Sequence, residues 1–185
     1  MNSTTLLGIP HRVLLAALSL CVVLVTGCGA SSKFKAIHEK AVKGDAQAQL
    51  ELGQMFLAGT EVKQSDSEGA KWCQQAAAKG LPAAQRFYGM MLLAGGAVPR
   101  NLAQGRVWLE KAANQGDVAA QIELATMLGL FSPPFDYAEA MKWLLIAEKN
   151  GSTNAPALIK LISEQISPAE LAQAREKAAA FGTEK

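Results

Sequence analysis

The side chains best able to do chemistry at neutral pH, those of cysteine and histidine, are few in this chain and stand far apart. Its 185 residues contain three cysteines and two histidines, at Cys21, Cys28, Cys73, His11 and His38. Metal sites need clustered ligands, and a catalytic thiol or hydroxyl needs a base within hydrogen-bond reach. The motifs G-x-S-x-G and H-E-x-x-H and the phosphate-binding glycine loop do not occur either. The sequence therefore predicts no catalytic residue, no metal site, no cofactor and no enzymatic activity.

The first 27 residues differ in composition from the rest of the chain. His11 and Arg12 precede VLLAALSLCVVLV, a run of thirteen apolar or small residues. A membrane-spanning helix needs about 20 apolar residues, whereas a basic start followed by a short apolar run is typical of a secretory signal. We therefore interpret residues 1–27 as a signal peptide, with a retained membrane anchor as the alternative.

The end of this segment suggests a covalent modification. Val25-Thr26-Gly27-Cys28 resembles the bacterial lipobox, a pattern of aliphatic, small, small and Cys. The resemblance implies cleavage before Cys28 and acylation of that residue, and two or more acyl chains anchor a protein stably. Gly29 stands where Asp usually retains such proteins at the inner membrane, which implies the periplasmic face of the outer membrane. Residues 28–33 would then be the lipidated cysteine and a short tether of about five residues, with a reach of at most roughly 17 Å.

Removal of Cys21 and acylation of Cys28 would leave Cys73 as the remaining thiol. An exported chain with one thiol has no internal disulfide available. We expect Cys73 to pack as a small hydrophobic residue beside Trp72. The alternative is a disulfide between two copies of the chain.

A fixed period runs through the rest of the sequence. Glycines recur at separations of 36, 36 and 35 residues, and tryptophans at 36 and 35. These residues are Gly44, Gly80, Gly116, Gly151, Trp72, Trp108 and Trp143. Such a period predicts stacked repeats. The expected fold is an all-α, α/α solenoid of antiparallel helix pairs within residues 34–182. About three repeats are expected, over 44–79, 80–115 and 116–150, between capping helices at 34–43 and 151–181.

Each unit also repeats the start signal of its second helix. Ser65, Asn101 and Asp136 are N-cap residue types, each followed three positions later by Glu or Gln as in a capping box. Each second helix is expected to end near the glycine that begins the next repeat, which gives the ranges 66–79, 102–115 and 137–150. A glutamine that recurs in every unit is expected to make a structural hydrogen bond to the neighbouring turn. It is found at Gln49, Gln85 and Gln121.

The residues around these glycines and tryptophans resemble a known repeat. Residues 46–59, AQAQLELGQMFLAG, are similar to the opening A-x-A-x-x-x-L-G-x-x-Y-x-x-G of the Sel-1-like repeat, a relative of the tetratricopeptide repeat. Residues 69–80 and 105–116 resemble its closing A-x-x-W-x-x-x-A-A-x-x-G. The resemblance covers about residues 36–181, and related proteins serve in secretion, exopolysaccharide export, envelope maintenance and host interaction. The chain departs from the family pattern at Gly69, Gly105 and Ala125.

Stacked helix pairs present a concave surface lined by the first helix of each unit. The side chains specific to one unit are the candidates for binding a partner there. They are Glu51, Gln54, Arg86, Phe87, Met90, Ile122 and Glu123. The middle unit contributes an aromatic ring and a thioether, which are frequent anchors of protein interfaces. Alternatively, Phe87 or Met90 belongs to the core between repeats. Leu50 is expected on the same exposed surface.

The net charge of +2 gives no electrostatic footprint for nucleic acid. We therefore expect a cell-envelope lipoprotein that is attached to the membrane through Cys28. Its concave face would bind an envelope protein, in the role of a scaffold or assembly factor. The alternatives are a binder of peptidoglycan or exopolysaccharide, which calls for exposed aromatic rings and polar pairs, and an enzyme, for which His38 is a poor candidate base.

Overall fold

The computed structural model describes residues 31–131 and 133–182, and every regular element in that part of the chain is a helix. In chain order the elements are α2 (Ser32–Val42), α3 (Ala46–Ala58), α4 (Asp66–Ala78), α5 (Pro82–Ala94), α6 (Leu102–Asn114), α7 (Val118–Thr126), the π-helix η1 (Met127–Phe131), α8 (Tyr137–Lys149), α9 (Ala155–Ser163) and α10 (Pro168–Ala180). The signal peptide and Cys28 lie outside the described residues. None of the helices in the described part is long and apolar enough to cross a membrane.

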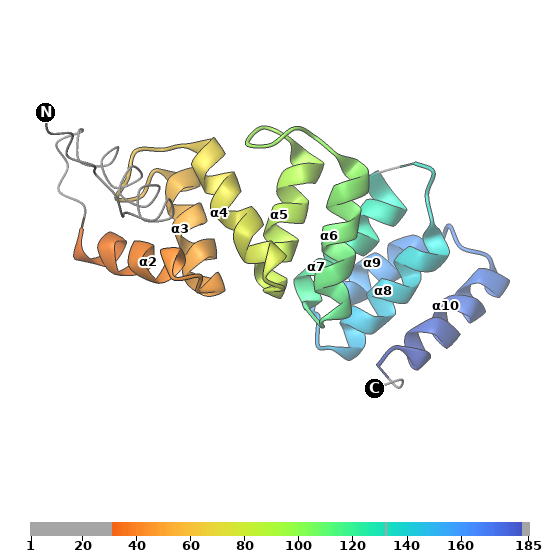
Figure 1. The fold of residues 1–185 in the computed structure, drawn as a ribbon. Coiled ribbons are helices and arrows are strands. Elements are labelled where there is room, and N and C mark those ends of the chain that lie inside the picture. Colours follow the sequence, from red (N-terminus) through yellow and green to blue (C-terminus); the bar gives the residue numbers. More distant parts are fainter. Residues whose placement is uncertain (1–30, 132, 183–185) are drawn as a thin grey trace, which may run out of the picture.

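The helices form a row of antiparallel pairs, which confirms the predicted solenoid (Figure 1). The pairs are α3 with α4, α5 with α6, and α7 and η1 with α8, and we refer to them as units one, two and three. Helix α2 covers one end of the row, and α9 and α10 cover the other (Figure 1). The second helices α4, α6 and α8 begin where predicted and end one residue earlier.

The first capping helix begins earlier than the sequence suggested. Helix α2 starts at Ser32 rather than Phe34, because the Ser31 hydroxyl accepts a hydrogen bond from the Phe34 amide at 3.1 Å. An N-cap serine of this kind satisfies an amide that has no partner within the helix. Three residues, 29–31, therefore separate Cys28 from the first helix instead of about five.

The predicted N-caps are present, but the reciprocal half of the capping box is not. The side chain of each predicted cap accepts from the amide three residues later, at 3.4, 3.0 and 2.9 Å. These caps are Ser65, Asn101 and Asp136. The Glu68 carboxylate does not reach back to its cap, because it accepts from Lys71 at 2.8 Å. Within the described residues, both halves of a capping box occur together at Ser167 and Glu170.

The recurring glutamine makes the structural hydrogen bond that its repetition predicted. In every unit its side-chain amide donates to the carbonyl eight residues earlier, in the last turns of the preceding helix, at 3.0, 3.3 and 3.1 Å. The pairs are Gln49 with Ala41, Gln85 with Ala77 and Gln121 with Ala113. Each glutamine is buried, so the bond ties successive helices together in a region that water does not reach.

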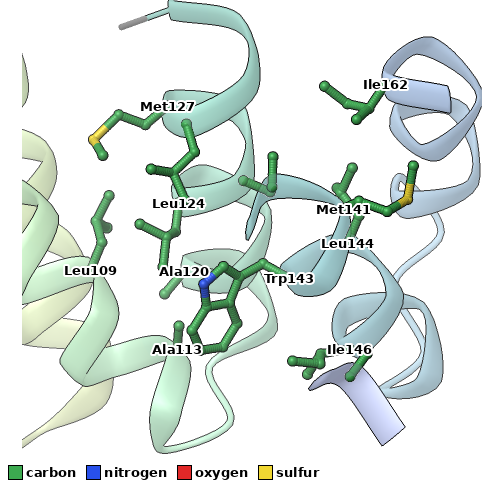
Figure 2. Close-up of a cluster of buried hydrophobic side chains, with 14 of the residues drawn as sticks. Leu109, Ala113, Ala120, Leu124, Met127, Met141, Trp143, Leu144, Ile146 and Ile162 are labelled. Atoms are coloured by element: carbon green, nitrogen blue, oxygen red, sulfur yellow. The ribbon is translucent and has the colours of Figure 1, made fainter. Parts of the chain in front are cut away.

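Three hydrophobic clusters follow one another along the row. The largest joins α6, unit three and the two C-terminal helices, with Leu109, Leu124, Met141, Leu144 and Ile162 at its centre (Figure 2). Small and large side chains alternate across the facing helices, as a close-packed interior requires. The core is therefore spread along the solenoid rather than gathered in one place.

Cys73 belongs to the middle cluster and is fully buried. Burial raises the pKa of its thiol to about 12, because a thiolate would lose its hydration. A buried thiol of this kind packs as a small hydrophobic side chain, as the sequence suggested, but it does so in the cluster of Tyr88, whereas Trp72 packs against the cluster of Phe34. A disulfide between two folded copies would need this sulfur at the surface, so the structure disfavours that alternative.

Candidate functional site

The first helices of the three units share a row of surface positions, which we call the first-helix face. Within each unit the positions are spaced i, i+3, i+4 and i+7, and they fall on one side of the helix. The described residues of this face are Gln47, Glu51, Gln54, Ala83, Arg86, Phe87, Met90, Ala119, Ile122, Glu123 and Thr126. All of them are at least partly exposed. Leu50 is an exception to the prediction, since it packs against Cys73 and Tyr88 and is only 5% exposed.

The two expected anchors of the middle unit lie in different environments. Met90 is 39% exposed and projects from the last turns of α5. Phe87 is half-buried and packs against the middle cluster, which includes Ala84 and Leu92. Met90 is therefore available to a partner as it stands, whereas Phe87 also serves the core between units.

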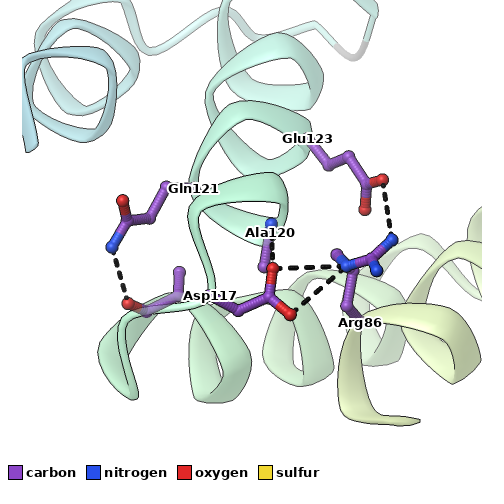
Figure 3. Close-up of polar contacts among 6 residues, drawn as sticks. Arg86, Asp117, Ala120, Gln121 and Glu123 are labelled. Atoms are coloured by element: carbon purple, nitrogen blue, oxygen red, sulfur yellow. Dashed lines mark hydrogen bonds and ion pairs between the residues drawn. The ribbon is translucent and has the colours of Figure 1, made fainter. Parts of the chain in front are cut away.

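Arg86 forms a bridge between units two and three (Figure 3). Its Nε lies 3.3 Å from the carboxylate of Asp117, and its Nη1 lies 3.5 Å from Oε1 of Glu123. The same Asp117 carboxylate caps α7 by accepting from the Ala120 amide at 2.9 Å. The two predicted contact residues Arg86 and Glu123 are thus brought together by the structure, and they neutralise each other within the chain.

The environment of Glu123 works against its charge. Burial raises the pKa of this carboxyl, and the neighbouring Asp117 acts in the same direction, while the Arg86 guanidinium opposes both. One oxygen, Oε2, is buried and has no hydrogen-bond partner. The folded state therefore holds the proton of Glu123 more tightly than the unfolded chain does. As the pH rises from 4.5, the ordinary pKa of a glutamate, through the raised pKa of Glu123, this group lowers the stability of the fold. Glu123 is therefore a contact between units two and three whose charge is opposed by burial, and it is not free to bind a basic partner.

The remaining predicted contact residues lie at the two ends of the face. Gln54 is exposed, and Glu51 lies 3.9 Å from Lys33 of the capping helix in a solvent-exposed ion pair. Ile122 is half-buried and packs against the C-terminal cluster. Of the seven predicted contact residues, the structure presents Glu51, Gln54 and Met90 with the least competition from contacts inside the fold.

No acid–base chemistry is indicated at His38. Its ring packs against Phe34 and the edge of Trp72, with centroids 5.7 and 6.2 Å apart. Burial lowers the pKa of His38, so the neutral ring is favoured. No group of three His, Cys, Asp or Glu residues within 31–131 and 133–182 is placed to hold a metal ion.

Two exposed aromatic side chains were not anticipated from the sequence. Phe131 is 79% exposed and Phe135 is 44% exposed, both at the connection between η1 and α8. A comparison of the repeats could have revealed them. Gly59 and Gly95 end the first helices of units one and two, and unit three has Phe131 at the equivalent position.

The sequence pattern of the Sel1 repeat matches the chain three times, over residues 46–81, 82–117 and 118–152. Each match begins two residues after the start expected for that unit. A Sel1 repeat protein from Oxalobacter formigenes has a similar structure, with a TM-score of 0.63, 30% sequence identity, and coverage of 70% of this chain and 98% of that one. No curated protein matches the chain.

A second similar structure is that of a protective antigen present in uropathogenic Escherichia coli strains, which displays an SLR fold. Its TM-score is 0.71 and its sequence identity 28%, and the similarity covers 92% of this chain. The chain spans only 37% of the length of that antigen.

Proposed function

The chain belongs to the Sel1 repeat family, and we propose that it is a lipid-anchored scaffold of the bacterial cell envelope whose first-helix face binds another protein. The fold is a repeat solenoid, an architecture that supplies extended surfaces for protein–protein interaction. The observation that carries the proposal is the row of equivalent positions Gln54, Met90 and Thr126. All three are at least partly exposed, and each unit places a different side chain there. A surface that varies from unit to unit on a constant framework can select one partner.

Met90 is the centre of the proposed contact. A thioether on a flexible stem adapts to an irregular apolar surface, and exposed methionine is enriched in protein interfaces. Gln54 and Glu51, on the same face in unit one, would supply hydrogen-bond donors and acceptors at the rim of the contact. Arg86, Asp117 and Glu123 hold units two and three in a fixed relation, so the contact surface is formed before the partner arrives.

The anchor is the second part of the proposal. The lipobox-like Val25-Thr26-Gly27-Cys28 supports acylation at Cys28 and a place at the periplasmic face of the outer membrane. With only residues 29–31 before α2, the solenoid would lie next to the bilayer, and its partner would be an envelope protein. Replacing Cys28 with Ala should release the protein from the membrane fraction, and unchanged fractionation would contradict the anchor.

The contact surface can be tested by site-specific photo-crosslinking in the native cell. A photo-reactive residue at Gln54 should capture one envelope protein, and the same residue at Val107, which is 47% exposed on α6, should not. Met90→Glu should abolish the capture at Gln54 while leaving the circular dichroism spectrum unchanged. Equal capture from both positions, or capture of peptidoglycan or polysaccharide in place of a protein, would overturn the proposal.

A further inference from the structure

Among the large hydrophobic side chains of the described residues, the most exposed is Phe131, at the connection between η1 and α8. Phe131 is 79% exposed and Phe135 is 44% exposed, and the two exposed prolines Pro133 and Pro134 lie between them in sequence. We call these four residues the aromatic tip. The Phe135 ring stacks on that of Tyr137, with centroids 5.7 Å apart, so it is held in place rather than loosely attached. Exposing the rings of Phe131 and Phe135 to water is unfavourable, so we expect another surface to cover them.

The aromatic tip lies on one edge of the solenoid together with the two corresponding loops. Since the helix pairs are antiparallel and stacked side by side, the connections after α3, after α5 and after η1 fall on the same edge (Figure 1). A backbone hydrogen bond of 2.8 to 3.0 Å closes each connection at the equivalent place. The donor and acceptor pairs are Ser65 with Phe56, Asn101 with Leu92, and Asp136 with Leu128. We call residues 59–64, residues 95–100 and the aromatic tip together the loop edge.

The chain that carries Cys28 enters the structure at this same edge. The Ser31 hydroxyl donates to the Glu61 carboxylate, which belongs to the first of the three loops. Ser31 lies three positions after Cys28, and three steps of 3.3–3.6 Å per residue span at most about 11 Å. An acylated Cys28 would therefore hold this end of the loop edge within a short distance of the lipid headgroups.

The charges along the loop edge fit a lipid surface. Lys63 and Arg100 are exposed on the first and second loops. Arg100 donates from Nε to the Leu93 carbonyl at 3.0 Å, which directs its side chain along the loop. The acidic side chain of the loop edge, Glu61, is engaged by Ser31, and Asp136, which follows the edge as the N-cap of α8, accepts from the Glu139 amide at 2.9 Å. Basic side chains near a membrane are attracted to anionic headgroups, and aromatic rings favour the boundary between headgroups and acyl chains.

We propose that the loop edge lies against the lipid bilayer, with Phe131 and Phe135 inserted into its interface. This gives the protein a second attachment, at the end of the row opposite to Cys28. The inference rests on the lipid anchor proposed above. A lipid surface is a better occupant than a second copy of the chain, because Ser31 fixes the anchored end of the chain at this edge. Two attachments orient the molecule, so the first-helix face is held at a constant angle to the membrane.

The experiment uses the full acylated protein in vesicles of phosphatidylethanolamine with a minor share of phosphatidylglycerol. Phe131→Trp keeps an aromatic ring at the tip and adds a fluorophore, and Lys149→Trp is the matched control at the opposite edge, on an exposed position. Wild-type protein supplies the emission of the native tryptophans as the baseline. With brominated acyl chains, the added emission of Phe131→Trp should shift to the blue and be mostly quenched, while that of Lys149→Trp should remain.

Absence of quenching at Phe131→Trp, with the acylated N-terminal peptide verified by mass spectrometry, would overturn the second attachment and leave the anchor intact. A non-acylated peptide would instead contradict the anchor itself. A blue shift that depends on protein concentration, without bromine quenching, would show that a second copy covers the tip and would also overturn the proposal. As an independent readout, Phe131→Ser combined with Phe135→Ser should open Lys63 and Arg100 to trypsin on vesicles, and unchanged protection would count against the model of two attachments.

Discussion

Units one and two cross their helices at facing glycines, whereas unit three does not. A Cβ added at Gly53 would lie 2.9 Å from the Gly69 carbonyl oxygen, and one added at Gly69 would lie 2.9 Å from that of Gly53. Gly89 and Gly105 repeat this arrangement in unit two at 3.1 and 3.0 Å. The backbones therefore approach too closely for any side chain at the crossing. In this chain Gly69 and Gly105, which depart from the family pattern, each face a glycine on the partner helix.

Unit three places alanine at both equivalent positions, Ala125 and Ala140, and moves the close contact one turn along. There the glycine is Gly129, whose missing Cβ leaves room for Ala140 and for Ile162 of α9. The end of the helix also differs, since Phe131 stands where Gly59 provides a left-handed cap in unit one. The π-helix η1 takes the place of the last α-helical turn of α3 and α5, and it ends at Phe131 itself. Unit three thus differs from its neighbours in the last turn of the helix, in the residue that ends it and in the surface that the connection exposes.

The glycine crossing is the part of this comparison with the largest expected effect on stability. Gly53→Ala would force a Cβ to within 2.5 Å of the Cys73 sulfur and 2.9 Å of a backbone oxygen. We expect a loss of about 1–3 kcal/mol in the free energy of unfolding, as for other overpacked cores. Ala125→Gly, the reverse change in unit three, should cost only about 0.5–1 kcal/mol from helix propensity. Urea denaturation of both variants measures the difference, and equal losses would mean that the two crossings are equivalent.

The helix stop gives the next largest effect. Gly59 has φ 68° and ψ 24°, the left-handed conformation in which a side chain costs about 1–2 kcal/mol. Gly59→Ala should therefore lower the free energy of unfolding by about that amount. Phe131→Ala at the equivalent position should change it by less than about 0.5 kcal/mol, because the ring is exposed and the backbone needs no glycine. A large loss in Phe131→Ala would show that the aromatic tip supports the fold rather than a surface contact.

The same contrast explains which features could be predicted from the sequence. The second helices were located to within a residue, because an N-cap oxygen and a terminal glycine act on the amides and carbonyls next to them. The π-helix was not foreseen, since no local residue pattern marks a widened turn and tertiary packing decides the outcome. The pairing of Arg86 with Asp117 and Glu123 joins residues 31 and 37 positions apart. No local pattern predicts contacts between residues so far apart in the sequence, so Arg86 and Glu123 were predicted as partner contacts.

The two ends of the solenoid differ in how the recurring tryptophan is covered, and this difference makes a pH-dependent prediction. The ring of His38 lies against Trp72, while the ring of Phe181 lies 5.5 Å from that of Trp143. Burial lowers the pKa of His38 below its ordinary value of 6.5, so the unfolded chain binds the proton more tightly. The stability from His38 is therefore complete above about pH 6.5 and is lost as the pH falls through its lowered pKa.

His38→Phe should remove this slope and make the first cap resemble the last. Thermal unfolding of the wild type and of His38→Phe, from below the lowered pKa of His38 to above pH 6.5, measures the difference in their pH dependence. The opposite contribution of Glu123 is the same in both proteins and cancels in this difference. Persistence of the full slope in the variant would assign it to another group.

The smallest expected effect concerns the buried glutamine of each unit. The Gln85 and Gln121 oxygens accept from Gln115 at 2.7 Å and from Asn150 at 3.2 Å. Unit one has Lys79 at this place, and its ammonium donates to the Gly44 carbonyl at 2.6 Å. The Gln49 oxygen is left buried without a partner.

Lys79→Gln should supply the missing donor and raise the free energy of unfolding by about 0.5 kcal/mol. The new hydrogen bond to Gln49 is worth about 0.5–1.5 kcal/mol, and the loss of the exposed bond from Lys79 to the Gly44 carbonyl offsets part of this gain. Gln115→Lys is the matched reversal in unit two and should lower stability by a similar amount. Urea denaturation at several salt concentrations separates this effect from a change in surface charge, which salt screens. If both variants shift stability in the same direction, the amide pairing does not distinguish unit one from its neighbours, and the orphan oxygen of Gln49 is satisfied by water instead.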